Sequence, residues 1–314
     1  MDASLALIAA QAFNGLQLGL LLFLVAAGLT LVFGIFDFLN LAHGAFYMLG
    51  AFISASLTLM LGSWPAAVVL TLPLMALLGA GLGEAVARPL LGARHHLAQV
   101  LATFGLLLML QALAMLIWGT QGLAVSLPSA LRGQVEILPG VSVSGYRLLI
   151  IIIGLAVAAG LHALLKHTRF GMQVRAIAAN PRMARCLGAP VGRIRAGVFG
   201  LSAALAGLAG ALVAPISEAS LSMSVEVIII AFVVIIIGGL GSIAGSFVAA
   251  LLVGMIDTLG RAFLDDVLLA LMPLELAETA APALSSMGIY LLMILVLIWR
   301  PGGLLPPARR GGAP

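Results

Sequence analysis

The sequence predicts an all-α protein, a polytopic bundle of transmembrane helices, from three observations. Of the 314 residues, 63% are apolar and only 8% are charged, whereas soluble domains carry roughly 25% charged residues. The apolar residues form long continuous runs, which indicate helices and not the alternating strands of a membrane barrel. Basic residues gather at the ends of these runs, as they do around membrane spans. We therefore expect residues 1–314 to form one transmembrane domain.

The apolar runs predict about 8–9 membrane-spanning helices, since one span needs about 20 apolar residues. Two of the runs are short or interrupted by glycine, and we expect these two spans to be broken or re-entrant. The candidate segments lie near residues 10–35, 44–62, 65–86, 97–118, 147–165, 195–215, 225–240, 243–261 and 284–300.

The positions of the basic residues predict which side of the membrane each connection faces. Twelve of the fifteen Lys and Arg residues fall in segments 87–96 and 166–195 and in the C-terminal segment, and such basic loops are retained in the cytoplasm. An odd number of crossings then places the N-terminus outside and the C-terminus in the cytoplasm. Connections 119–146 and 262–283 face outward, and the alternation over residues 141–144 indicates a small two-stranded ribbon.

The segment at about 166–195 is strongly basic, with seven basic residues and no acid between two apolar runs. It is too short to form a domain with its own core, but it has the right size for a short cytoplasmic helix that a partner protein grips. A loop that is basic only to set the membrane topology is the alternative. The basic residues are Lys166, Arg169, Arg175, Arg182, Arg185, Arg193 and Arg195.

Polar and glycine residues interrupt two of the apolar runs, and these interruptions are the candidate substrate pathway. Interrupted spans at comparable positions of two halves point to a transporter with its binding site at the breaks. For the first interruption, a structural turn that caps a helix at the membrane surface is the alternative. The candidate pathway residues are Asp37, Asn40, His43 and Gly44 in the first interruption, and Gly238, Gly239, Gly241 and Ser242 in the second.

Residues four positions apart predict local contacts. We expect helical ion pairs between Glu84 and Arg88 and between Asp257 and Arg261. Glycines at the same spacing predict helices whose backbones approach closely. These glycine pairs are Gly15/Gly19, Gly79/Gly83 and Gly241/Gly245.

The sequence lacks the motifs of several chemistries. The single lysine, Lys166, follows no glycine-rich loop, so the chain has no phosphate-binding P-loop and does not hydrolyse ATP itself. It has no His-Glu-x-x-His or Gly-x-Ser-x-Gly stretch, and its one cysteine, Cys186, excludes an internal disulfide. His95 and His96 are adjacent, but no nearby acid or cysteine completes a metal site. We expect no enzymatic activity, no metal, no cofactor and no nucleic-acid binding.

Several blocks of the sequence resemble the permeases of branched-chain amino-acid ABC transporters of the Liv type, specifically the subunit with the Asn-x-Ala-His-Gly block. The blocks run in order over almost the whole chain. They are Ala26–Phe52, which contains Asn40-Leu-Ala-His-Gly, then Arg88-Pro-Leu, Ala102-Thr-Phe-Gly-Leu, Thr168–Ala178, Ala184-Arg-Cys-Leu-Gly, Gly207-Leu-Ala-Gly-Ala-Leu, Gly238–Gly245 and Arg300-Pro-Gly-Gly-Leu.

The resemblance implies the transmembrane permease subunit of an ATP-driven importer in the bacterial inner membrane. Its substrates would be branched-chain or other hydrophobic amino acids, or related small amides. Its partners would be two cytoplasmic ATPase subunits, a second and paralogous permease subunit, and a periplasmic substrate-binding protein, all around the lipid bilayer. The alternative is an ion-gradient-driven secondary transporter, for which only Asp37 or Asp257 could serve as the coupling residue near the membrane centre.

Within this resemblance, the basic segment corresponds to the cytoplasmic segment that couples the permease to the ATPases. We expect Gly171 to permit a turn, a helix to start at Arg175, and a short amphipathic helix to follow Pro181 and to end at Gly188. Small residues there would dock closely in an ATPase groove, and the arginines would meet acids. The expected coupling residues are Gly171, Arg175, Arg182, Ala184, Arg185 and Gly188.

Overall fold

A computed structural model describes residues 3–91, 96–128, 131, 133–138, 141–269 and 274–306; His95 lies outside the described residues. The elements follow one another as α1 (Ala3–Phe36), α2 (His43–Leu61), α3 (Trp64–Leu82), the π-helical turn η1 (Gly83–Ala87), α4 (Arg88–Leu90), α5 (His96–Trp118), β1 (Gln134–Leu138), β2 (Val141–Ser144), α6 (Gly145–His167), α7 (Arg169–Ala179), α8 (Pro181–Cys186), α9 (Val191–Val213), α10 (Met223–Gly238), α11 (Ile243–Leu269) and α12 (Leu274–Trp299).

The helices confirm the all-α transmembrane class. Each candidate segment coincides with a helix, and among the described residues seven helices are long and apolar enough to cross a membrane. That number is slightly lower than expected because two apolar helices are shorter. These are α10, with 16 residues, and the described apolar part of α12, Met287–Trp299. At 1.5 Å per residue, α10 is about 24 Å long, less than the ~30 Å hydrocarbon core of a bilayer.

The connections between the helices differ from the expectation in two places. Helix α1 continues unbroken to Phe36, and α10 and α11 are separate helices, so both predicted interruptions lie between helices and not inside one. Helices α11 and α12 also extend into 262–283, which we expected to be a loop. Hydropathy marks only the apolar part of a helix, and its backbone hydrogen bonds continue beyond that part. The predicted ribbon is confirmed, because β1 and β2 pair in antiparallel fashion.

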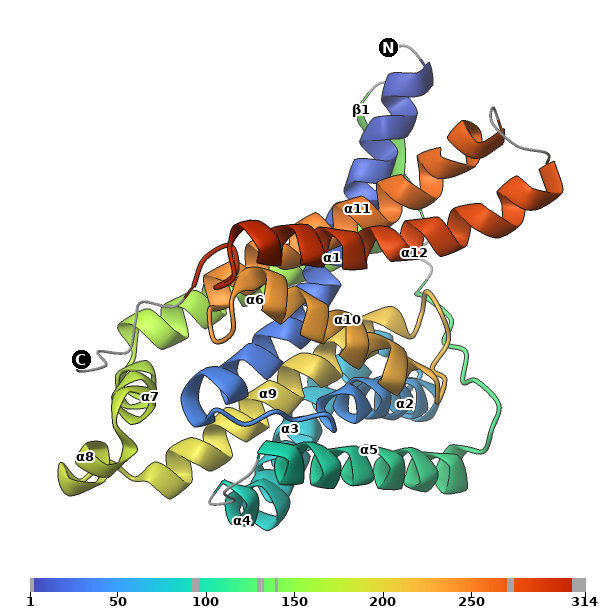
Figure 1. The fold of residues 1–314 in the computed structure, drawn as a ribbon. Helices are drawn as coiled ribbons and strands as arrows, with labels where there is room; N and C mark the ends of the chain where they lie inside the picture. Colours follow the sequence, from blue (N-terminus) through green and yellow to red (C-terminus); the bar gives the residue numbers. More distant parts are fainter. Residues whose placement is uncertain are drawn as a thin grey trace.

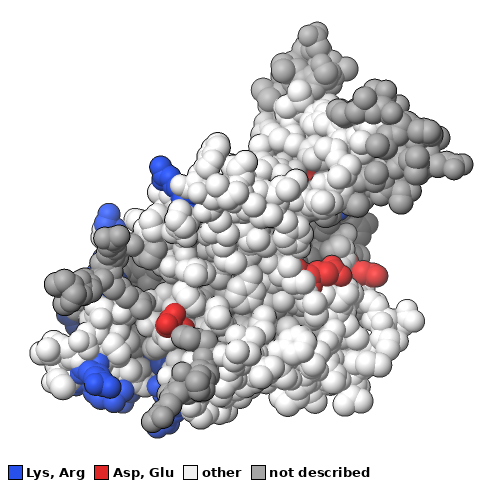
Figure 2. Space-filling model, viewed as in Figure 1, with Lys and Arg blue, Asp and Glu red and all other residues white. Residues whose placement is uncertain are grey.

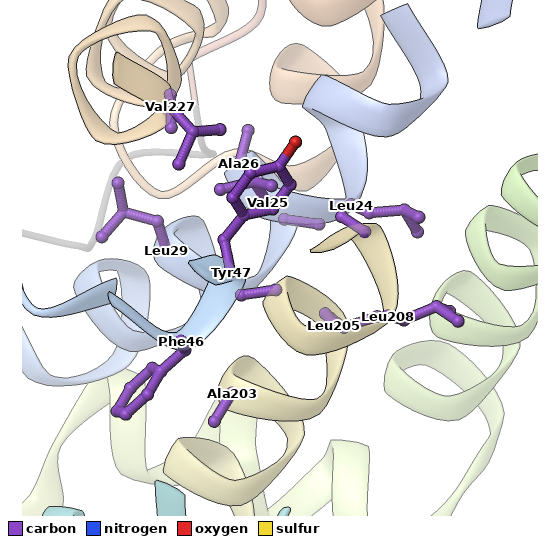
Figure 3. Close-up of a cluster of buried hydrophobic side chains, with 14 of the residues drawn as sticks. Leu24, Val25, Ala26, Leu29, Phe46, Tyr47, Ala203, Leu205, Leu208 and Val227 are labelled. Carbon is purple, nitrogen blue, oxygen red and sulfur yellow. The ribbon is translucent and has the colours of Figure 1, made fainter. Parts of the chain in front are cut away.

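Helices α1, α2, α9 and α10 form the core of the bundle. Figure 3 shows Leu24, Tyr47, Leu205 and Val227, one from each helix, within one cluster of buried side chains. Each of these side chains is 8% exposed or less. Burial of large apolar side chains from segments more than 180 residues apart in the sequence therefore joins the two halves of the chain.

Glycines allow these helices to approach at backbone distance. A Cβ atom added to Gly210 of α9 would lie 2.0 Å from the carbonyl oxygen of Tyr47 in α2. The predicted glycine pairs behave in the same way. A Cβ added to Gly19 would lie 2.9 Å from the Ala250 carbonyl oxygen of α11, and one added to Gly79 would lie 2.7 Å from the Phe199 carbonyl oxygen of α9. The expected close helix contacts are therefore confirmed at these positions.

Charge separates the two ends of the bundle. In Figure 1, α7, α8 and the C-terminal ends of α1, α10 and α12 lie together on the left, and the N-terminus lies at the top. Figure 2 shows Lys and Arg side chains gathered over α7 and α8 with one acidic group near them, an acidic patch over the α9–α10 connection on the opposite side, and a broad uncharged belt between the two sides. We call the end that holds α7 and α8 the basic end.

Candidate functional site at the basic end

Helices α7 and α8 are set by local capping contacts. The side chain of Thr168 accepts a hydrogen bond from the Gly171 N–H (3.1 Å) at the start of α7. The Asn180 side-chain oxygen accepts from the N–H groups of Arg182 (3.1 Å) and Met183 (3.0 Å) at the start of α8, and Pro181 follows as its first residue. Thr and Asn are preferred caps, and proline suits the first helical position. The expected restart after Pro181 is confirmed.

Gly188 ends α8, as the sequence predicts. Its backbone is left-handed (φ 82°). Its N–H donates to the Arg185 carbonyl (3.0 Å), and the N–H of Ala189 donates to the Ala184 carbonyl (3.0 Å). These two bonds are the Schellman pattern that closes a helix, and glycine favours it because it lacks a Cβ. Gly188 is therefore explained by its own backbone conformation.

The faces of α7 and α8 correct two expectations. Helix α7 begins at Arg169 and not at Arg175, and Gly171 lies inside it, where an added Cβ would be 2.2 Å from the Leu165 carbonyl oxygen. Gly171 therefore permits a close backbone approach to α6 and not a turn. Ala184 is 4% exposed and packs inward, so it anchors α8 to the bundle and does not face outward.

The outward face of α8 carries large apolar and basic side chains. Met183 is 57% exposed and Leu187, at the C-terminal end of α8, is 81% exposed. Arg182 and Arg185 are exposed beside them, and so is Arg175 on α7. An exposed apolar pair flanked by arginines is typical of a surface that a partner protein covers.

Arginines from three elements meet next to α8. A cavity of about 520 Å³ is lined by Arg88, Arg185, Arg193 and Arg195. The expected pair of Glu84 with Arg88 forms at 3.5 Å, but Arg195 of α9 binds Glu84 more closely, with Nη2 at 2.7 Å from one carboxylate oxygen and 2.9 Å from the other. The sequence offered no signal for this contact, because 111 residues separate the two partners.

Glu84 lies in η1, a single π-helical turn. Turns of this kind are frequent at functional sites. The ion pair ties η1 to α9, so the arginine cavity is held rigidly at the start of that helix.

The first predicted interruption is the connection from α1 to α2, and it begins at the basic end. Asp37 ends α1 in a left-handed conformation (φ 51°) and is exposed. Asn40 is 4% exposed. The hydroxyl of Thr103 in α5 accepts from the Leu41 N–H (3.2 Å) and so supports the connection. Asp tolerates this backbone conformation better than most residues.

His43 and Gly44 are buried where three helices meet. Nε2 of His43 donates to the Val25 carbonyl of α1 (2.9 Å), which leaves Nδ1 to accept from the Ser202 hydroxyl of α9 (3.3 Å). A Cβ on Gly44 would lie 2.0 Å from the Ser224 carbonyl oxygen in the first turn of α10. Both residues therefore hold helices together, and contact of either one with a solute stays a prediction.

The second interruption is closed by the C-terminal segment. The N–H of Leu304 donates to the Ile237 carbonyl (2.8 Å) and the N–H of Leu305 to the Gly238 carbonyl (3.2 Å). Gly239 has φ 102°, and an added Cβ there would lie 2.8 Å from the Gly302 carbonyl oxygen. The Pro-Gly-Gly-Leu segment at 301–304 thus packs by its backbone on the Gly238-Gly239 pair.

The remaining residues of the second interruption have distinct positions. The Ser242 hydroxyl accepts from the Gly245 N–H (3.1 Å) and caps α11. An added Cβ on Gly241 would lie 3.1 Å from Gly34 of α1. The second interruption therefore packs against the C-terminal part of α1, although the sequence separates Gly34 and Gly241 by about 200 residues. Of the eight candidate pathway residues, Gly241 lines a cavity of about 700 Å³ between α1, α6, α7 and α11, and Asn40 lines a small one.

The fold and this site define a multi-pass membrane protein with a short basic helical segment exposed at one end. Among the residues that the structure describes, no group of His, Cys, Asp and Glu could hold a metal ion. The chain belongs to the family of permease components of branched-chain amino acid transport systems, whose profile matches residues 11–297. No solved structure matches the chain.

Three relatives illustrate the family. The chain is 31% identical to the high-affinity branched-chain amino acid transport system permease protein BraD of Pseudomonas aeruginosa, over 94% of both chains. It is 28% identical to the permease protein LivH of Escherichia coli (strain K12), again over 94% of both chains. It is 31% identical to the probable permease protein LivH of Methanocaldococcus jannaschii, over 76% of both chains. These relatives are transport permeases and not enzymes.

The structure and the comparisons favour an ABC permease over an ion-driven transporter. Asp37 is exposed at a helix end, and Asp257 is paired with Arg261 four residues later, as predicted (3.0 Å). Neither is an isolated carboxyl group at the centre of a span, which an ion-coupled mechanism would use.

Proposed function

We propose that this chain imports branched-chain or other hydrophobic amino acids, or related small amides, as one permease subunit of an ATP-driven transporter. Its partners would be two ATPase subunits, a paralogous permease subunit and a periplasmic substrate-binding protein. The relatives' names and the family support this assignment. The chain would lie in the bacterial inner membrane with the basic end and the C-terminus in the cytoplasm, and with the N-terminus outside, because basic segments stay inside.

The observation that carries the proposal is the outward face of α8. Met183, Leu187, Arg182 and Arg185 are exposed, whereas Ala184 fastens the helix to the bundle. The apolar pair would fill a groove on the ATPase, and the arginines of α8 and Arg175 of α7 would pair with acids at its rim.

The chain connects this surface directly to the core. Gly188 ends α8, and α9 begins three residues later at Val191. Helix α9 packs against α1, α2 and α3 by backbone contacts at glycines such as Gly28, Gly210 and Gly79. Because packed helices move as rigid bodies, a displacement of α8 by the ATPases would rotate α9 and its neighbours together. Alternate opening of the pathway to each side would follow from this movement.

Co-purification of the ATPase tests the docking surface. We expect Leu187→Asp to lose the ATPase, because a charge would replace an apolar side chain at the centre of the interface. Met60→Asp is the matched control, since Met60 is also 81% exposed but lies at the C-terminal end of α2, away from α8. A native amount of ATPase on the Leu187→Asp variant, with normal membrane insertion, would falsify the docking role.

The natural cysteine tests the orientation without any mutation. Cys186 is the single cysteine of the chain and is exposed at the end of α8. A membrane-impermeant maleimide should label it in inside-out vesicles that lack the ATPase and should not label it in intact spheroplasts. The opposite pattern would place the basic end outside and would overturn the proposed coupling.

A further inference from the structure

The cavity of about 700 Å³ at the basic end shares only Arg175 with the proposed ATPase contact, and its volume is that of a ligand site. Small-molecule sites have volumes of about 300–1,000 Å³, and this cavity lies within that range. Along α1 it extends from Phe23 to Ile35, a distance of about 18 Å at 1.5 Å per residue. It is therefore long enough to hold an extended chain.

The wall of the cavity is apolar. Phe23 packs edge-on against Phe247 of α11, with ring centroids 5.1 Å apart, and both line the cavity. The hydroxyl of Thr30, another lining residue, already bonds to the Ser246 hydroxyl at 2.7 Å. Leu31 and Val248 complete this surface. Such a wall favours a hydrocarbon occupant.

The mouth of the cavity is basic. His162 and Lys166 of α6 and Arg175 of α7 line it, and all three are exposed. Arg175 donates to the carbonyl oxygen of Leu165, the residue next to Lys166, so this bond holds the two cations together. Guanidinium has five N–H donors, and most of them stay available. No acid lines the cavity among the residues that the structure describes.

We propose that this cavity binds an anionic phospholipid, with one acyl chain against Phe23 and Phe247 and the phosphate at Lys166 and Arg175. Basic pockets between transmembrane helices on the cytoplasmic side bind anionic head groups, and both ends of this cavity match that chemistry. The inference rests on the proposed orientation, which places the basic mouth at the cytoplasmic leaflet. The lipid would fill the space between α1, α6 and α11 while α7 contacts its head group.

Native mass spectrometry of the assembled transporter, in nanodiscs of phosphatidylglycerol or phosphatidylcholine, tests this site. We expect retained phosphatidylglycerol and little phosphatidylcholine. The double variant Lys166→Gln/Arg175→Gln should lower the affinity for phosphatidylglycerol roughly 30-fold, because each basic residue near an anionic surface contributes about fivefold. Arg169→Gln/Arg193→Gln removes the same charge from the same end without altering the cavity or the docking face of α8, and should retain the lipid.

A steric variant tests the apolar part independently. Ala158→Trp on α6 would fill the cavity, whereas its neighbour Ala159 is exposed and does not line it. We expect Ala158→Trp to lose the lipid and Ala159→Trp to keep it. Equal retention by both variants, or equal retention of the two lipids by the native chain, would overturn the proposal.

A photoreactive side chain at position 158 identifies any other occupant. Crosslinking to phospholipid supports the lipid site, whereas crosslinking to the chain's own C-terminal residues or to the partner permease overturns it. The labelling of Cys186 described above separates failure of the lipid site from failure of the proposed function. Reversed labelling would refute the orientation and the coupling, whereas lost lipid selectivity with normal labelling would refute only the lipid site.

Discussion

Helices α9 and α8 use small residues for opposite purposes. In α9, Gly210 and Gly200 bring α2 and α3 to backbone distance, because an added Cβ would lie 2.0 Å from the Tyr47 carbonyl oxygen and 2.8 Å from the Ala76 carbonyl oxygen. In α8, Ala184 anchors one side while the large side chains of Met183 and Leu187 remain exposed. The glycines at these core contacts therefore leave no room for a side chain, whereas α8 exposes large side chains that another protein can cover. The difference predicts that mutations at the core glycines lower the stability of the permease, and that mutations on the exposed face of α8 weaken only its coupling to the ATPase.

The largest effect is expected at a core glycine. Gly44→Ala would place a Cβ 2.0 Å from the Ser224 carbonyl oxygen, and such overpacking costs about 3 kcal/mol of unfolding free energy. Gly105→Ala in α5 meets open space and should be neutral, or stabilising by up to about 1 kcal/mol. Thermal melting of the purified permease measures both. If Gly44→Ala melts normally and changes only substrate uptake, Gly44 belongs to the pathway and not to the packing.

The contact of the C-terminal segment with Gly239 is also close enough to exclude a side chain. Gly303→Ala combines a left-handed backbone (φ 85°) with a Cβ 2.4 Å from the Gly239 Cα, and we expect a loss of about 2 kcal/mol or more. Gly62→Ala has a similar backbone (φ 66°) but no neighbour within 4 Å, so it should lose only the conformational ~1 kcal/mol. Equal melting temperatures for the two variants would show that the C-terminal contact adds nothing.

Two arginines of one cavity should separate stability from coupling. Arg195 is 12% exposed and binds both oxygens of Glu84, so Arg195→Ala should cost about 1.5 kcal/mol. Arg185 is exposed on α8, and Arg185→Ala should change stability by less than about 0.5 kcal/mol. Arg195→Ala should lower the melting temperature, whereas Arg185→Ala should lower the ATPase activity that the binding protein stimulates. Identical profiles for both would contradict the division between core and docking surface.

The smallest effect is expected at the hydrogen bonds of His43. Ser202→Ala removes the hydroxyl that Nδ1 accepts from and should cost about 1 kcal/mol, the typical net value of one bond. Thr58→Ala removes only a bond within α2 and is expected to be near neutral. Substrate KM should stay unchanged in both. A shift of KM in Ser202→Ala at native stability would return His43 to the substrate pathway.

Several local features of this chain follow from short stretches of sequence. Asn180, Pro181 and Gly188 mark the start and end of α8 through capping, which depends on neighbouring residues alone. The Asp257–Arg261 pair follows from helical spacing in the same way. Burial was not predictable: Ala184 looked suited to an outward contact because it is small, yet it faces the bundle. The Glu84–Arg195 pair was also missed, because only folding brings residues 111 positions apart together.

The sequence by itself determined that this chain is a membrane helix bundle with one basic end, because solvation by lipid and the retention of positive charge act on composition and order. Tertiary structure decided what the two interruptions are. Their glycines looked like breaks in the middle of spans, but packing places them at helix ends. Gly44 contacts α10, Gly241 contacts α1, and Gly238 and Gly239 contact the C-terminal segment. The reason is physical: glycine permits both a break and a close contact, and only the neighbouring helix selects between them.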